Sequence, residues 1–119
     1  MSTEGFEQAI ALGYGFEGPV VELGAGMQDG IALPKARVRL PLAMLNRHGL
    51  VAGATGTGKT KSLQVMAEQL SAAGVPTFIS DIKGDISGLG ASGQLNDKVT
   101  ARTAAIGMTD YAPRAFPVE

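Results

Sequence analysis

The 119-residue chain contains no cysteine and a single histidine, His48. The lack of cysteine excludes disulfide bonds, thiolate metal sites and cysteine nucleophiles, and it fits a protein of a reducing compartment. A lone histidine supplies no second metal ligand and no acid–base partner. We therefore interpret His48 as a capping or packing residue.

The chain also lacks long apolar segments and an excess of basic charge. No apolar run approaches the roughly 18 residues of a membrane-spanning helix, and the N-terminus lacks the basic start and apolar core of a signal peptide. We therefore expect a cytoplasmic protein with no membrane segment. The formal net charge of -1 argues only weakly against nucleic acid, because a multi-subunit motor can concentrate a few basic side chains in a channel.

What is present is the composition of a folded globular protein, with 45% hydrophobic and 18% charged residues. Residues 6–12 fit a short helix, which the following glycines end. Residues 20–42 hold short β-leaning stretches separated by Asp29-Gly30, a pair favoured in hairpin turns. We therefore predict an N-terminal segment, residues 1–42, with a small β-hairpin.

Residues 43–119 have the pattern of a strand, a crossover helix and a second strand. Residues 49–52 and 75–79 are short apolar runs, and residues 60–73 between them place apolar side chains at helical spacing. A βαβ unit closes into a parallel sheet. We predict an α/β fold in which this region is part of a parallel-sheet core, and the motif at residues 53–60, described below, makes that core one of the P-loop NTPase type.

Beyond the second strand the pattern is less regular. Glycines and serines make residues 84–94 loop-like. Residues 96–106 fit another helix, capped by Asn96 and ended by Gly107. Residues 115–118 resemble the start of a further strand.

Residues 53–60, Gly-Ala-Thr-Gly-Thr-Gly-Lys-Thr, form a complete P-loop motif between the predicted strand and helix. Phosphates require backbone N–H groups turned inward, which glycine permits through positive φ and its missing Cβ. The helix N-terminus adds unpaired N–H groups and the positive end of its dipole. Lys59 is predicted to reach the β- and γ-phosphates, and the Thr60 hydroxyl to coordinate Mg²⁺. The predicted nucleotide-binding residues are Gly53, Ala54, Thr55, Gly56, Thr57, Gly58, Lys59, Thr60 and Lys61.

Asp81 follows the predicted strand 75–79 and is the second candidate site residue. Because loops at the carboxyl ends of parallel strands share one sheet edge, we expect Asp81 beside the P-loop. There its carboxylate can bond a magnesium-bound water or orient the attacking water. We therefore predict Lys59 and Asp81 as catalytic residues, and Thr60 and Asp81 as the metal site. Lys83 can touch phosphate or pair with a carboxylate. The alternative interpretation is a solvated charged turn.

Three stretches together resemble a known family: residues 38–42, Val-Arg-Leu-Pro-Leu; residues 46–60 through the P-loop; and residues 80–89, Ser-Asp-Ile-Lys-Gly-Asp-Ile-Ser-Gly-Leu. They are similar to the N-terminal part of a bacterial family of HerA-like P-loop ATPases, relatives of the HerA and FtsK DNA-translocating motors. The resemblance implies ATP and Mg²⁺ as ligands, a RecA-like core, assembly into a ring, and DNA translocation or helicase-type activity.

Members of that family continue much further, with a later strand bearing the Walker B carboxylates, a sensor position and an arginine finger. No segment after Lys59 ends an apolar run with Asp-Glu. We therefore expect an N-terminal fragment or truncated product that lacks Walker B and the arginine finger. Two alternatives stay open: a P-loop small-molecule kinase, which requires a lid with several arginines, and a non-catalytic nucleotide-binding or interaction module.

Overall fold

The computed structural model describes all 119 residues. They form two compact units, which are described separately: a hairpin unit, Met1–Asn46 with Leu95–Ala112, and a P-loop unit, Arg47–Gln94 with Pro113–Glu119. No helix in either unit has the length and apolar character needed to cross a bilayer.

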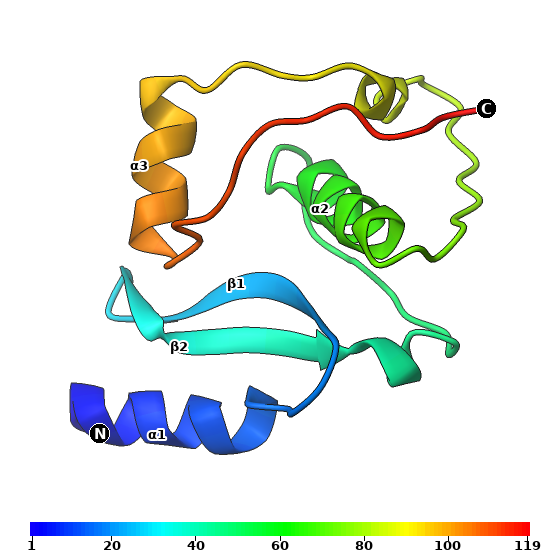
Figure 1. Cartoon of the computed structure of the whole chain (residues 1–119). Coiled ribbons are helices and arrows are strands. Elements are labelled where there is room, and N and C mark those ends of the chain that lie inside the picture. Colours follow the sequence, from blue (N-terminus) through cyan, green and yellow to red (C-terminus); the bar gives the residue numbers. More distant parts are fainter. The chain divides into compact units, whose positions relative to one another are not determined.

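The hairpin unit is built on two antiparallel strands, β1 (Val20–Gln28) and β2 (Ile31–Pro41) (Figure 1). Asp29 and Gly30 join them with φ values of 51° and 79°. Both central residues are left-handed, as a two-residue type I′ turn requires, and this twist matches that of the strands. The predicted hairpin and its turn are confirmed.

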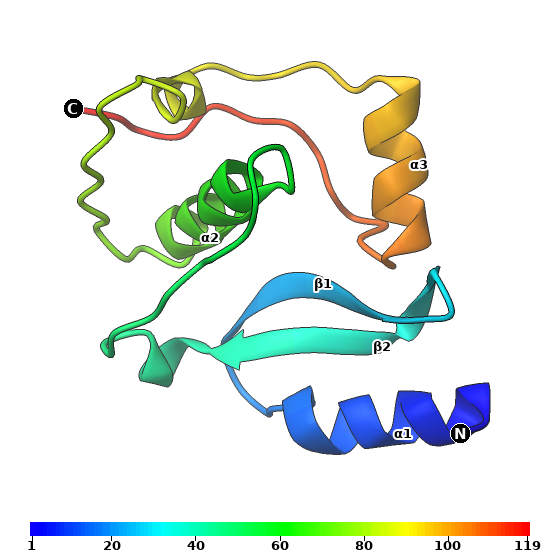
Figure 2. The same cartoon turned by 180° about the vertical axis from the view of Figure 1, so that it is seen from behind.

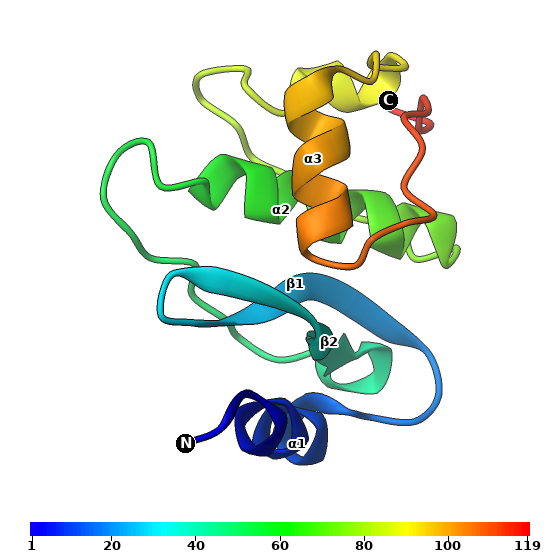
Figure 3. The same ribbon diagram turned by 90° about the vertical axis from the view of Figure 1, so that its left-hand side faces the viewer.

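Helix α1 (Thr3–Tyr14) packs along the hairpin (Figures 1 and 3). The Ser2 hydroxyl caps it by accepting a hydrogen bond from Gly5 N at 3.1 Å. The helix approaches closely where β1 has Gly26, since a Cβ there would lie 3.0 Å from the Phe6 ring and 3.3 Å from Ile10 Cγ1. The predicted helix at 6–12 is confirmed and is longer than expected.

Helix α3 (Asp97–Ala105) lies on the opposite side of the hairpin from α1 (Figure 3). Its start and end follow the predicted signals. The Asn96 side chain accepts a hydrogen bond from Val99 N at 3.0 Å, and Gly107, with φ 75°, turns the chain away from the helix. Val21 and Ala36, both 0% exposed, form the core of this unit.

A charge network joins the two strands of the hairpin. Glu22 and Arg39 are direct cross-strand partners, and Arg39 Nε lies 2.8 Å from Glu22 Oε1. Arg37 is two residues away on β2, on the same face, and its Nη2 lies 2.9 Å from Glu22 Oε2. The single carboxylate is thus shared by two guanidinium groups.

The P-loop unit contains helix α2 (Lys59–Ala72) and a short 3-10 turn, η2 (Ser87–Gly90) (Figure 2). The predicted helix at 60–73 is confirmed, and Ala67 on its expected apolar face is 7% exposed. Gly74, with φ 78°, ends the helix, and Val75 N donates to Leu70 O at 2.9 Å. These are the features of a glycine-terminated helix end.

The two strands predicted on either side of α2 do not form in this structure. Residues 49–52 and 75–79 have no regular secondary structure, and the chain's sheet consists of β1 and β2 alone. The coarse α/β prediction holds, but the parallel P-loop core is not shown. An extended segment becomes a strand only when another segment pairs with its backbone, and neither run has such a partner here. Residues 115–118 likewise form no strand; Phe116 N donates one hydrogen bond to Leu89 O at 2.9 Å.

Candidate nucleotide-binding site

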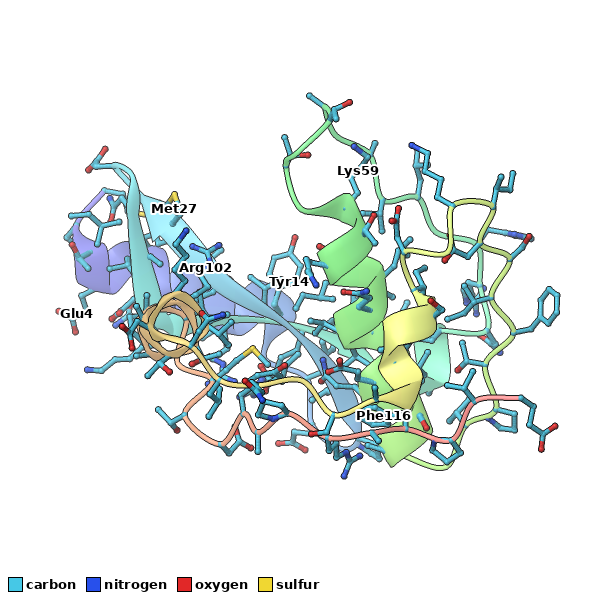
Figure 4. The ribbon with its side chains drawn as sticks, turned by 90° about the horizontal axis from the view of Figure 1, so that it is seen from above. Glu4, Tyr14, Met27, Lys59, Arg102 and Phe116 are labelled. Atoms are coloured by element: carbon cyan, nitrogen blue, oxygen red, sulfur yellow. The ribbon has the colours of Figure 1, made fainter.

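The P-loop rises from the N-terminal end of α2, and Lys59 lies at the base of the loop (Figure 4). Gly56 and Gly58 have φ values of 79° and 101°, in the left-handed region that glycine adopts without strain. A Cβ at either position would meet no atom within 4 Å. These glycines are therefore required by the backbone path of the loop and not by crowding.

Three donors of the loop converge on one acceptor, the carbonyl oxygen of Ala54. Lys59 Nζ lies 2.8 Å from it, Thr57 Oγ1 lies 2.6 Å from it, and Thr57 N lies 3.3 Å from it. The ammonium group is thus folded back over the loop. Ala54 O supplies the kind of negatively polarised oxygen that a phosphate also offers.

The loop and the first turn of α2 fit a phosphate group. Residues 53–58 and Thr60 are exposed, and Lys59 is half-buried. The first amides of a helix have no intrahelical acceptor, and its N-terminus carries partial positive charge. No three His, Asp or Glu side chains gather to hold a metal ion. Thr60, one of the two predicted magnesium residues, lies in the first turn of α2.

Asp81 is engaged in its own turn. Its Oδ2 accepts a hydrogen bond from Ile86 N at 2.8 Å, and no hydrogen bond or ion pair joins it to Lys59 or Thr60. The half-buried Asp81 carboxylate therefore closes the turn that follows it. Its predicted catalytic and metal-site roles stay predictions.

A hydrogen bond between α2 and this turn was not predicted from the sequence. Gln64 Nε2 donates a hydrogen bond to the carbonyl oxygen of Asp85 at 2.9 Å, across 21 positions of the chain. The turn is also closed from within, because Ser87 Oγ donates to Gly84 O at 2.8 Å. A glutamine on an amphipathic helix carries no local signal for such a partner, so only the fold reveals it.

An open groove of about 920 Å³ lies on the C-terminal half of α2, within the P-loop unit. Ala67 and Glu68 line it on α2, and Phe78 lines it on the segment after α2. Phe116, labelled in Figure 4, lines it on the C-terminal segment. Burial raises the pKa of the Glu68 carboxyl above its ordinary value of 4.5, although the positive charges of Lys61 and Arg114 oppose this shift.

Comparison with known proteins identifies a family. The family model described as helicase HerA-like C-terminal matches residues 28–119, most of the chain. No curated protein and no solved structure matches. The matched region contains the P-loop, the Asp81–Ile86 turn and the segments that carried the resemblance. The chain therefore belongs to the HerA-like helicase family.

Proposed function

We propose that this chain binds the phosphates of ATP, together with Mg²⁺, at residues 53–60. The observation that carries the proposal is the position of Lys59, whose ammonium lies 2.8 Å from Ala54 O at the base of a loop in which Gly56 and Gly58 have positive φ. A phosphate oxygen carries more negative charge than a carbonyl oxygen. It would therefore displace Ala54 O as the partner of Lys59.

The other parts of the site have supporting roles in this proposal. The amides at the start of α2 bind phosphate oxygens, and Thr60 holds the metal ion that neutralises the triphosphate. Lys61, the next residue of the helix, adds positive charge near the first turn. Asp81 orients a water molecule once the adjoining segments pair into a sheet.

At the level of the whole protein, we propose that the chain is the nucleotide-binding segment of a HerA-like motor ATPase. Family membership and the P-loop support this role. Assembly into a ring and action on DNA are parts of the same proposal. An exposed P-loop suits a ring motor, in which a neighbouring subunit completes the nucleotide site.

Nucleotide binding is tested by comparing Lys59→Ala with Lys98→Ala in a titration with a fluorescent ATP analogue and Mg²⁺. Lys98 is an exposed lysine on α3, in the other unit, so its replacement controls for loss of one positive charge. Lys59→Ala is expected to weaken binding about tenfold to hundredfold, as loss of a hydrogen bond to a charged group implies. Equal affinity in both variants would contradict the proposal.

A further inference from the structure

Gln64 lies one helical turn after Thr60, on the same face of α2, because residues four apart stand one above the other on a helix. The Thr60 hydroxyl belongs to the P-loop, whereas the Gln64 amide reaches out of the helix to Asp85 O at 2.9 Å. One face of α2 therefore carries, in successive turns, a predicted metal ligand and a tie to the Asp81–Ile86 turn.

That turn is a closed structure of its own. Asp81 Oδ2 accepts from Ile86 N at 2.8 Å, Ser87 Oγ donates to Gly84 O at 2.8 Å, and Gly84 has φ 76°. Its internal hydrogen bonds hold its shape, so the hydrogen bond from Gln64 restrains the turn as a whole. The tie uses the backbone of Asp85 and leaves its carboxylate uncommitted.

We propose that Gln64 is a positioning residue, which links the order of the Asp81–Ile86 turn to phosphate binding at the P-loop. The proposal rests on the proposed nucleotide site. Phosphate bound at the start of α2 restrains the first turns of the helix, and with them the backbone that carries Gln64. A turn bonded to Gln64 then loses mobility with the helix, and this gives coupling without a large change of shape.

The consequence is a nucleotide-sensitive surface. Ile82 in the turn is fully exposed, at 101% of its reference area, and the neighbouring Lys83 is exposed as well. When the turn is held against α2, these side chains keep a fixed direction. When the tie is broken, their direction becomes independent of the nucleotide.

The test is hydrogen–deuterium exchange of residues 81–87, with and without Mg²⁺ and a non-hydrolysable ATP analogue. In the wild type we expect the analogue to slow exchange of the turn about two- to tenfold, the range that one hydrogen bond supplies. In Gln64→Leu, which keeps size and helix propensity but removes the donor, exchange should be faster without nucleotide and should not respond to it. Gln64→Lys restores a donor and should restore the response.

A matched control and a binding measurement separate the two proposals. Gln8 is an exposed glutamine on α1, in the other unit, so Gln8→Leu should behave as the wild type. Unchanged affinity of Gln64→Leu for the analogue supports a positioning role.

Equal protection of the turn in Gln64→Leu and the wild type would overturn the inference while leaving nucleotide binding intact. Loss of affinity in Gln64→Leu would overturn it too, because Gln64 would then belong to the binding site. A wild type that binds no analogue would refute the proposed function, and the coupling with it.

Discussion

Arg37 on β2 donates a hydrogen bond from Nη1 to the carbonyl oxygen of Gly107, the residue that ends α3. The same guanidinium pairs with Glu22 on β1. One side chain therefore joins both strands of the hairpin to the residue that follows the C-terminal end of α3, 70 positions away. The positive charge also suits the negative end of the helix dipole.

Replacing Arg37 with Ala should destabilise the hairpin unit by about 1.5–3 kcal/mol, because a hydrogen bond with a charged group and an ion pair are lost together. Urea unfolding followed by tyrosine fluorescence measures this, since both tyrosines, Tyr14 and Tyr111, lie in that unit and the chain has no tryptophan. The control is Lys35→Ala, because Lys35 is an exposed lysine on the same strand. An equal loss of stability in both variants would show that Arg37 acts only through its charge.

Two glycine-to-alanine changes should shift stability in opposite directions. Gly107 has φ 75°, and a Cβ there would lie 3.0 Å from Pro34 O, so Gly107→Ala should cost at least about 1 kcal/mol. Gly13 lies in α1 with nothing within 4 Å of its Cβ position, so Gly13→Ala should stabilise by up to about 1 kcal/mol. The same urea titration compares them, and shifts of the same sign would contradict the described backbone.

The start of α3 depends on Asn96, whose side chain accepts from Val99 N. Asn96→Ala should destabilise the helix by about 0.5–2 kcal/mol, whereas Asn96→Asp keeps the acceptor and should be close to neutral. Amide exchange of residues 97–105 is the measurement. Similar exchange in Asn96→Ala and Asn96→Asp would argue against this cap.

The raised pKa of Glu68 predicts a pH-dependent gain from Glu68→Gln. A carboxyl whose folded-state pKa exceeds its unfolded value destabilises the fold when it is ionised, and this cost disappears as the pH falls through the folded pKa towards the ordinary 4.5. Glu68→Gln should therefore stabilise the P-loop unit at pH 7, and the difference should vanish at pH values below the ordinary pKa. Amide exchange of α2 at several pH values tests this. A stabilisation that persists unchanged at low pH would mean that the pKa shift is not its cause.

The sequence predicted those features that depend on neighbouring residues. The Asp29-Gly30 turn, the Asn96 cap and the Gly107 helix end are local devices, whose backbone angles follow from residue type. Helix α2 followed from the spacing of its apolar residues. Each of these was confirmed because no distant part of the chain has to supply a partner.

The features that differ from the predictions, and those that were not predicted, all depend on a distant part of the chain. Strand formation at 49–52 and 75–79 needs another segment's backbone, and apolar patterning shows only that these residues can form strands. The bonds of Gln64 with Asp85 and of Arg37 with Gly107 join positions that no local signal relates. The position of Asp81 beside the P-loop depended on the predicted parallel sheet, so it could not be inferred more firmly than the sheet itself.

The most direct test of phosphate binding at residues 53–60 is a titration of the ¹⁵N-labelled chain with ATP and Mg²⁺, followed by two-dimensional amide NMR. Phosphate binding at the P-loop should produce saturable shifts in the amides of Gly56, Gly58, Lys59 and Thr60, with the resonances of β1 and β2 unchanged. Absence of shifts in the P-loop amides at millimolar ATP, or shifts confined to residues outside the P-loop unit, would contradict it.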